Sequence, residues 1–303
     1  MKICVIHPQN FKFGGIEVLV KELTRRLEKK GYEIVFPEQK NFTSLKLKRL
    51  WLWFKCKPTE SDLVHLFDFN LPSLLGKPPV ISTFAGSVQG VFWKTKNISA
   101  FFGGCMERLR AEQSDVNITV SRGIQKYIKN SIYIPNGVDI KKFKPKSHDI
   151  KIETDKIKVL WVGRKEWLKG YYDLPKLTKD FYLLQCLDKP HDEMPKYYNS
   201  CDVFILPSHF EGMALTVLEA MACGKPVVAY NVGGLADCIF NGVNGYLVKE
   251  NDYKSFVNKI KLAYENRKKL GRNGRKLCEL IFNWDNVVNQ YEDVYRYLLG
   301  DSS

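Results

Sequence analysis

The chain has 303 residues, enough for two ordinary domains, and its 45% hydrophobic and 26% charged residues are typical of a globular protein, which excludes general disorder and a coiled-coil rod. No apolar stretch approaches the roughly 18 to 20 residues that span a bilayer, which excludes an integral membrane protein. The formal net charge is +14: residues 1–150 hold 25 Lys+Arg and 13 Asp+Glu, a balance of +12, whereas residues 151–303 hold 22 and 20, a balance of +2.

Short β-branched runs alternate with amphipathic segments along the first half, which is typical of an α/β protein with parallel sheets. The first clear helix carries apolar residues at helical spacing from Ile16 to Leu27, and we expect it to end near Gly31. The strands expected in this half are Ile3–Ile6, Glu33–Phe36, Leu63–Phe67, Val80–Phe84, Asn117–Val120 and Ile132–Ile134.

The second half repeats the α/β pattern after a polar stretch, and we interpret residues 146–157 as a linker. A helix is expected over 194–199, and a last helix over 284–299. Two similar halves predict a ligand at the carboxyl ends of the strands, in the cleft between the domains. The strands expected here are 158–163, Tyr182–Leu187, Val203–Leu206, Val227–Tyr230 and Tyr246–Val248.

Targeting and redox signals are few. The N-terminal apolar run Ile3–Ile6 is too short for a secretory signal, so we expect a cytoplasmic protein. The eight cysteines include no Cys-x-x-Cys pair, which indicates reduced, mostly buried thiols rather than a disulfide frame or a zinc site.

The densest positive charge lies between Ser44 and Pro58, where cations alternate with Leu, Trp and Phe. One interpretation is a peripheral membrane segment, because tryptophans suit the bilayer interface and lysines meet anionic lipid. The other is a buried helix with solvated lysines. Nucleic acid is not expected, because no zinc finger, RNP-type strand or Gly-x-x-Gly clamp accompanies the charge. A weaker stretch of the same kind is Val91–Phe102. The residues expected at a membrane are Lys46, Lys48, Arg49, Trp51, Trp53, Phe54 and Lys55.

The strongest group of chemically active residues follows the strand that ends near Pro207. Glu211 and Glu219 lie eight positions apart, and if Glu211 begins a helix, the rise of about 1.5 Å per residue separates them by roughly 12 Å. The amides at a helix start would offer donors and the positive dipole end to an anion between them. The alternative is that Glu211 is a helix cap and Glu219 an ordinary helical residue. The donor-binding residues expected here are Gly212, Met213, Ala214, Leu215 and Glu219.

This stretch resembles the signature of family 4 retaining glycosyltransferases, which have the GT-B arrangement of two facing Rossmann-like domains. Several other segments match the family's motifs in the same order along the chain. They are Gly14-Gly15-Ile16-Glu17, Ile134–Asp139, Val162-Gly163-Arg164 with Lys169-Gly170, Pro226–Ala229 and Gly233-Gly234.

The resemblance implies a GT-B α/β fold with an N-terminal acceptor domain over 1–145, a donor domain over 158–283, and a C-terminal helix over 284–303 that crosses back to the first domain. It implies catalytic roles for Glu211, Arg164 and Lys169, the last two stabilising the departing diphosphate. Gly14 and Gly15 would approach the donor closely. Transfer would retain the anomeric configuration. No cofactor and no divalent metal is implied, and the sequence holds no Asp-x-Asp pair.

Two departures from the family stand out. Between Gly170 and residues 194–199 there is room for about one strand, where relatives have two strands and two helices, so donor specificity does not carry over. Ala85 also stands where many relatives place a histidine near the transferred sugar. His7, His65 and Gly86 are the possible acceptor-side residues, although each histidine is more often a packed core residue.

The expected function is transfer of a sugar, a hexose, from a nucleotide-sugar to a glycolipid or surface-polysaccharide acceptor, at the inner face of the cell membrane. Its partners would be the donor, the acceptor and an anionic membrane surface, with a second protein as a further candidate. One alternative is a non-catalytic binding or partner subunit of a transferase. Another is a nucleotide-sugar epimerase or a phosphorylase on the same fold.

Overall fold

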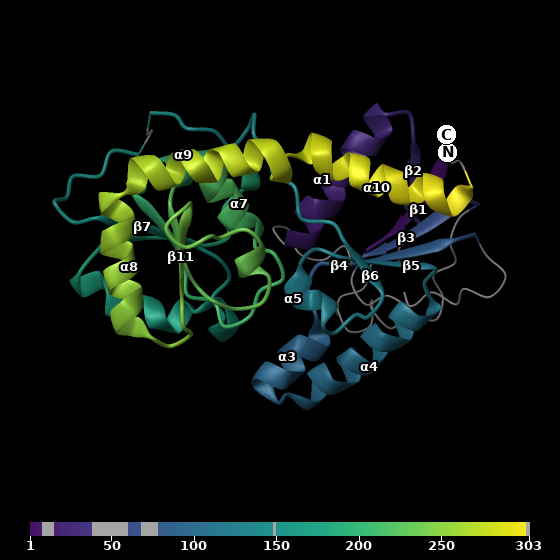
Figure 1. Cartoon of the computed structure of the whole chain (residues 1–303), viewed down its shortest axis with the longest axis horizontal. Helices are drawn as coiled ribbons and strands as arrows, with labels where there is room; N and C mark the ends of the chain where they lie inside the picture. The colour runs from purple at the N-terminus through teal and green to yellow at the C-terminus, as the bar shows by residue number, and fades with distance from the viewer. Residues whose placement is uncertain (8–14, 38–59, 68–77, 148–149, 301–303) are drawn as a thin grey trace. The chain divides into compact units, whose positions relative to one another are not determined.

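The computed structural model describes residues 1–7, 15–37, 60–67, 78–147 and 150–300. It divides into two compact units, which we describe separately (Figure 1). Unit 1 consists of Met1–Pro135 with Val287–Ser303, and unit 2 of Asn136–Asn286. Each unit holds one fully parallel sheet with helices, which confirms the expected pair of Rossmann-like domains.

Unit 1 is built on a six-stranded sheet in the order β2-β1-β3-β4-β5-β6. Every residue of its two central strands β3 and β4 is buried, as is typical of a parallel sheet covered on both faces. The strands are β1 (Lys2–Ile6), β2 (Glu33–Val35), β3 (Leu63–Phe67), β4 (Val80–Phe84), β5 (Val116–Thr119) and β6 (Ser131–Tyr133). The helices are α1 (Gly15–Lys29), α3 (Val88–Thr95), α4 (Ile98–Gln113), α5 (Arg122–Gln125) and most of α10 (Trp284–Leu299).

Helix α10 closes unit 1, and within this unit it runs past β1 and β3 in Figure 1. The Tyr295 hydroxyl lies 2.8 Å from His65 Nδ1 of β3. The Glu292 carboxylate accepts hydrogen bonds from Lys30 Nζ at 2.6 Å and from the Tyr32 hydroxyl at 2.9 Å. Burial opposes ionisation of Glu292, but these donors and neighbouring cations hold its pKa below the usual value. The last helix of the chain therefore belongs to the first unit.

Unit 2 is built on a five-stranded sheet in the order β11-β10-β9-β7-β8. Its core includes Trp161, Phe181, Ile205, Val228 and Phe256, all buried. The strands are β7 (Lys158–Val162), β8 (Tyr182–Cys186), β9 (Val203–Leu206), β10 (Val227–Tyr230) and β11 (Gly245–Val248). The α-helices are α6 (Met194–Asn199), α7 (Leu215–Ala222), α8 (Tyr253–Glu265) and α9 (Arg267–Leu277).

The segment between β7 and β9 holds one strand, β8, as the sequence predicts. Three short 3-10 helices accompany this strand: η1 (Trp167–Lys169), η2 (Tyr171–Lys179) and η3 (His191–Glu193). All eleven strands of the described chain agree with the expected ones to within one residue at each end.

The expected linker is not where the chain divides. The division falls after Pro135, and residues 136–147 pack with unit 2. Arg275 Nη1 donates to the carbonyl oxygens of Ile140 at 3.0 Å and Phe143 at 2.7 Å, while the Lys146 amide donates to Asn199 Oδ1 at 3.0 Å. Hydrogen bonds, together with single buried side chains such as Phe143, hold this polar stretch in place without a periodic apolar face.

Two further predictions concern the membrane and the cysteines. Within the described part of the chain, no helix is both long and apolar enough to cross a bilayer. The expected membrane segment at 44–58 lies outside the described residues. Of the seven described cysteines all are free thiols, and only Cys105 is exposed, which agrees with the expectation of buried, reduced thiols.

Candidate active site

The order of strands in unit 2 places the candidate site. β7 pairs with β8 on one side and with β9 on the other, so the chain changes direction across the sheet at β7. The carboxyl ends of β7 and β9 flank this switch point, which is where open α/β sheets bind their ligands. Arg164 and Lys169 follow β7, and Glu211 follows β9. Residues distant in sequence thus come to one edge of the sheet.

Lys169 and Glu211 form the central ion pair of the site. Lys169 Nζ lies 2.8 Å from Glu211 Oε1 and 2.9 Å from Oε2, so the ammonium spans both carboxylate oxygens. The Glu211 side chain is 7% exposed and that of Lys169 is 27% exposed. Trp161, buried in the core, donates from Nε1 to the Lys169 carbonyl at 3.0 Å and so fixes the backbone beneath the lysine. The ammonium offsets the cost of burying the carboxylate while remaining accessible from solvent.

Two glycines allow the backbone segments of the site to approach one another closely. Gly170 has φ +69° and a Cβ there would lie 2.0 Å from the Pro207 carbonyl oxygen. Gly233 has φ +55° and a Cβ there would lie 1.7 Å from the Glu211 carbonyl oxygen. Only glycine fits both the conformation and the space. The turns that contain Gly170 and Gly233 therefore set the position of the segment from Pro207 to Glu211.

His209 is a residue of this loop that the sequence did not single out. Its ring stacks on Trp167 with centroids 4.3 Å apart, and its backbone amide donates to the Leu168 carbonyl at 2.8 Å. His209 Nδ1 lies 2.7 Å from Glu250 Oε1, and Nε2 lies 3.5 Å from Asp173 Oδ2. His209 thus ties the loop after β9 to three other segments of unit 2.

The prediction that Glu211 begins a helix is wrong, because α7 begins at Leu215. Glu211 lies in the preceding loop, so it is not a helix cap and the helical rise does not set its distance from Glu219. Ala214 occupies the cap position without a side-chain hydrogen bond. Asn136 Nδ2 donates to the Met213 carbonyl at 2.7 Å and fixes the loop. The first amides of α7 have no acceptor within the helix and can serve an anion.

Glu219 is a buried carboxylate with two partners, rather than an ordinary helical residue. Its Oε1 lies 2.6 Å from His191 Nε2, and its Oε2 accepts from the Tyr198 hydroxyl at 2.6 Å. Burial, together with the adjacent carboxylate, raises the pKa of Tyr198 well above its usual value, so Tyr198 stays protonated and donates. Neither partner can be recognised from the sequence, because His191 and Tyr198 lie 28 and 21 residues from Glu219 along the chain.

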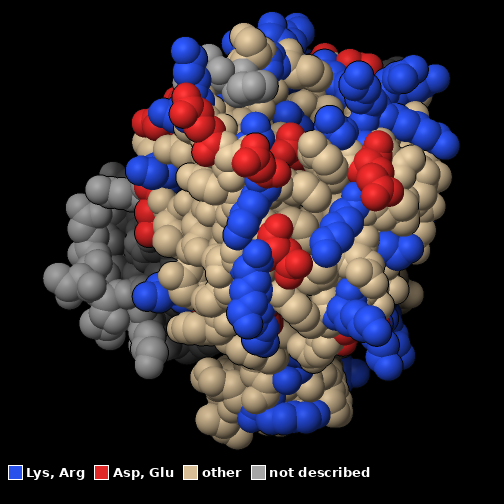
Figure 2. Space-filling view, turned by 90° about the vertical axis from the view of Figure 1, so that its left-hand side faces the viewer, with Lys and Arg blue, Asp and Glu red and all other residues tan. Residues whose placement is uncertain are grey.

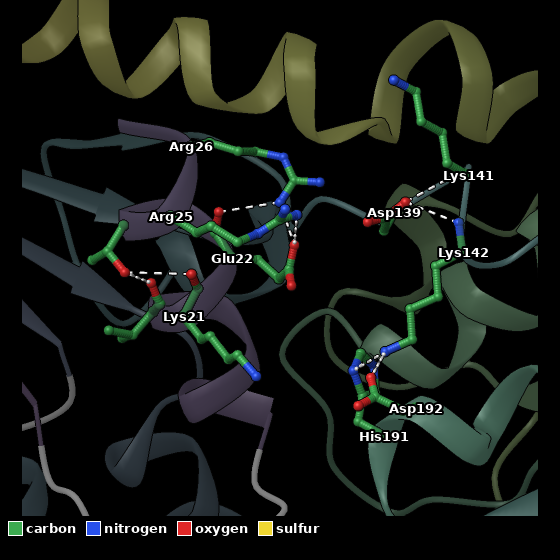
Figure 3. A network of polar contacts seen from close by, with 11 residues as sticks. Lys21, Glu22, Arg25, Arg26, Asp139, Lys141, Lys142, His191 and Asp192 are labelled. Carbon is green, nitrogen blue, oxygen red and sulfur yellow. Dashed lines mark hydrogen bonds and ion pairs between the residues drawn. The ribbon is translucent and has the colours of Figure 1, made fainter. Parts of the chain in front are cut away.

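Lys142 and Glu219 contact the two ring nitrogens of His191 from opposite sides. Lys142 Nζ lies 3.0 Å from His191 Nδ1 and 2.7 Å from Asp192 Oδ1, as Figure 3 shows. An ammonium can only donate, so Nδ1 must accept. We therefore assign Nδ1 as the acceptor and Nε2 as the nitrogen that donates to Glu219. Hydrogen bonds thus connect Lys142 to His191 and His191 to Glu219.

Arg164 forms an exposed ion pair just beyond the carboxyl end of β7. Its Nη1 lies 3.2 Å from Glu166 Oε1, and both side chains are exposed. A guanidinium on an exposed loop at the carboxyl end of β7 can turn toward a diphosphate bound at the switch point.

The candidates in unit 1 differ in their surroundings. His65 is fully buried in β3, and its Nε2 lies 2.8 Å from Thr83 Oγ1 in addition to the contact with Tyr295. Burial, aided by the charge of Arg110, lowers the pKa of His65 to about 3, so it is a neutral core histidine. His7 follows β1, contacts Phe36 edge-on at 5.8 Å and lines a cavity of about 390 Å³.

The glycines and the membrane residues named from the sequence complete the account. Gly15 is the exposed first residue of α1, and Gly86 is exposed just after β4. Gly14 and the expected membrane residues lie outside the described ranges. On helix α1, the Glu22 carboxylate forms ion pairs with Arg25 and Arg26 (Figure 3).

The chain is similar to known glycosyltransferases. Residues 148–277 match the model of the family Glycosyl transferases group 1. A capsular polysaccharide biosynthesis glycosyltransferase of Staphylococcus aureus, CapM, is 34% identical over 109 residues, which are 35% of this chain and 29% of CapM. The chain spans about a third of the length of the first relatives that it matches. The "Uncharacterized glycosyltransferase MJ1607" of Methanocaldococcus jannaschii is 24% identical over 93% of this chain and 94% of its own.

Solved structures agree on the fold. Sucrose-phosphate synthase from Thermosynechococcus elongatus is similar with a TM-score of 0.79 over 99% of this chain and 100% of that one, at 19% identity. Anabaena Alr3699/HepE in complex with UDP-glucose gives a TM-score of 0.70 over 98% and 100%, at 16% identity. The fold is GT-B, and residues 148–277, within unit 2, are similar to the glycosyl transferases group 1 family.

Proposed function

We propose that this protein is a retaining glycosyltransferase that moves a hexose from a nucleotide-sugar to a hydroxyl of a glycolipid or surface-polysaccharide acceptor. The observation that carries the proposal is the Lys169–Glu211 pair at the switch point of a unit that matches a glycosyltransferase family. The names of similar proteins support the donor and the acceptor class: HepE is described with UDP-glucose, and CapM acts in capsular polysaccharide biosynthesis.

In the proposed reaction, the bond between the anomeric carbon and the diphosphate oxygen breaks as the acceptor oxygen bonds to that carbon from the same face. The acceptor proton passes to the leaving phosphate. Lys169, Arg164 and the first amides of α7 stabilise the negative charge that develops on the diphosphate. Glu211 holds hydroxyls of the donor sugar, and Glu219 the ribose hydroxyls. No divalent metal is required in this scheme.

The proposed location is the cytoplasmic face of the cell membrane, with peripheral attachment. The basic segment between Ser44 and Pro58 supports this, since it combines lysines with Trp51 and Trp53. Attachment would bring the enzyme to acceptors that are built on lipid.

The donor class can be tested first by ligand-dependent stability. We expect one of UDP, GDP and ADP at millimolar concentration to raise the melting temperature, because a ligand at 100 times its dissociation constant stabilises the fold by about 2.7 kcal/mol. Differential scanning fluorimetry with each nucleotide identifies the donor class, and a screen of its nucleotide-sugars follows. An unchanged melting temperature with every nucleotide would contradict the proposal. It would favour a non-catalytic partner subunit, an alternative suggested by the short segment around β8.

Variants of the central pair test the chemistry. We expect Glu211→Gln and Lys169→Gln to lower sugar transfer by at least about 100-fold, since each removes a charge from the donor site. Both replacements can still form hydrogen bonds, so circular dichroism should confirm a retained fold. Lys179→Gln, an exposed lysine of the same unit, serves as the matched control and should leave transfer unchanged. Full activity in both site variants would reject the proposal.

A further inference from the structure

The tip of the helical hairpin α3–α4 in unit 1 exposes a cluster of large apolar side chains. Trp93, Ile98 and Phe102 are 58%, 68% and 63% exposed, and Phe101 is also exposed. The cluster is contiguous: Phe92 lies 5.6 Å from Trp93 and 5.3 Å from Phe101, and Phe101 lies 5.7 Å from Phe102, between ring centroids. Contiguous exposed apolar clusters of this kind usually mark an interaction surface.

The hairpin is firmly built, so this exposure is not the result of a loosely packed element. The Glu107 carboxylate of α4 accepts hydrogen bonds from the Ser87 hydroxyl and from the Val88 and Gln89 amides, each at 3.0 Å, and so caps the start of α3. At the turn, Lys96 adopts the left-handed conformation and Asn97 caps α4. The base and the turn of the hairpin therefore hold the aromatic tip outward.

The charge of the tip restricts what it can bind. From Ala85 to Met106 the chain has no Asp or Glu, whereas Lys94 and Lys96 lie among the aromatic residues. Lys96 Nζ lies 4.5 Å from the centroid of the Trp93 ring. The hairpin is the lowest part of unit 1 in Figure 1, and its tip in Figure 2 has tan and blue atoms and no red. The surface of the tip is therefore apolar and cationic, and it has no acidic side chain.

A second copy of the chain fits this surface poorly. A two-fold contact through the tip would bring together two cationic surfaces that have no Asp or Glu between Ala85 and Met106, and like charges repel. An anionic bilayer meets both properties at once. Tryptophan and phenylalanine partition into the headgroup region, and each nearby lysine adds about 1 kcal/mol of attraction to an anionic membrane surface.

We propose that the α3–α4 tip docks on the surface of an anionic bilayer, with the side chains of Trp93, Ile98 and Phe102 inserted at headgroup depth. This inference rests on the membrane attachment proposed above and names the element that makes it. It does not depend on the segment 44–58 or on sugar transfer, so binding alone tests it.

The experiment is sedimentation of the full chain with vesicles of equal parts phosphatidylglycerol and phosphatidylcholine, and with phosphatidylcholine alone. We expect binding to the anionic vesicles, and a fall of about tenfold or more in the partition coefficient for Trp93→Ser with Phe102→Ser, since their apolar surface drives insertion. Lys94→Gln with Lys96→Gln should weaken binding to the anionic vesicles. The matched control is Tyr172→Ser, an exposed aromatic residue of unit 2, which should bind as the original chain does.

The inference would be overturned if the original chain did not bind anionic vesicles, or if the aromatic double variant bound them equally well. It would also be overturned if sedimentation velocity showed that this variant loses a dimer while its vesicle binding is unchanged. The variants concern exposed side chains and should keep the original melting temperature. Sugar transfer to a water-soluble acceptor should also persist in them. Failure of the docking inference would therefore leave the transferase proposal standing, and a chain without transferase activity could still bind vesicles.

Discussion

Lys142 contacts Glu219 only indirectly, through the ring of His191. With the ammonium at 3.0 Å from Nδ1, the Nε2 proton of His191 is available to Glu219. Without it, Nδ1 loses the partner that fixes the orientation of the ring, and the hydrogen bond from Nε2 to the Glu219 carboxylate is less well aligned. A carboxylate that loses this donor is less well oriented for ribose hydroxyls. Lys142 is thus a positioning residue under the proposed function.

We therefore expect Lys142→Met to raise the KM for the nucleotide-sugar about tenfold while kcat changes little, because a hydrogen bond to a charged group contributes about 1.5–3 kcal/mol. Steady-state rates at varied donor concentration measure both constants. Lys142→Arg, which restores a donor, should recover most of the affinity. The control is Lys141→Met: Lys141 is exposed, and its described contact is made by its backbone amide to Asp139. Equal KM values for the two Met variants would contradict the assignment.

At the scale of elements, the turn around Gly233 supports the loop that carries Glu211. The Gly234 amide donates to the Gly212 carbonyl at 2.9 Å, and Gly233 leaves no room for a side chain against the Glu211 carbonyl. A methyl group there must displace one of the two segments. Because the displaced loop holds half of the central ion pair, the effect should reach the chemistry as well as the stability.

An alanine at position 233 must adopt a positive φ, which alone lowers the free energy of unfolding. We expect the clash in Gly233→Ala to lower it by about 1–3 kcal/mol more, and to lower kcat/KM at least about tenfold. Gly242→Ala separates the two effects, since Gly242 also has a positive φ, +75°, but has open space around its Cβ position. Urea denaturation and initial rates should show a small loss of stability for Gly242→Ala and unchanged catalysis. If both variants behave alike, the close approach at Gly233 does not position the loop.

The same elements show how far the sequence could predict the structure. Strands such as Leu63–Phe67 and Val203–Leu206 were predicted at their observed bounds, because their apolar runs are short and sharply ended. The start of α7 cannot be predicted closely, because Met213 and Ala214 continue the apolar run of the helix and no capping side chain marks the boundary. The Lys169 and Glu211 residue types were predicted, but only the strand order shows that they meet.

The partners of Glu219 could not be predicted from the sequence. His191 belongs to a short 3-10 helix without apolar periodicity, and Tyr198 reads as a core residue of α6. Both become site residues only through tertiary packing. His65 is the opposite case, since its place within a buried strand already favoured a packed histidine over a ligand-binding one.

At the scale of the whole molecule, the chain leaves unit 1 after Pro135 and returns to it at Val287, so unit 1 is completed by both ends of the chain. His65 is central to this closure, because its two ring nitrogens contact Thr83 of β4 and Tyr295 of α10. The stability of unit 1 should therefore depend on the protonation of one buried imidazole.

The sign of that dependence follows from the lowered pKa. The pKa of His65 falls from 6.5 to about 3 on folding, so the folded state favours the neutral ring. This stability is fully present above pH 6.5 and is lost as the pH falls from 6.5 toward 3, because the unfolded chain takes up the proton first. We expect the free energy of unfolding to fall by a few kcal/mol over this range, on the order of 1.4 kcal/mol per pH unit.

His65→Gln isolates this contribution, since glutamine keeps hydrogen-bonding groups but does not titrate. Urea denaturation of both proteins between pH 7 and pH 4 gives the two free energies at each pH. The original chain should lose stability more steeply than the variant, although carboxylates that titrate in both proteins add a common slope. The difference between the two curves should be nearly constant above pH 6.5 and should change steadily below it. Parallel curves over the whole range would mean that His65 is reached by solvent and protonated in the folded chain.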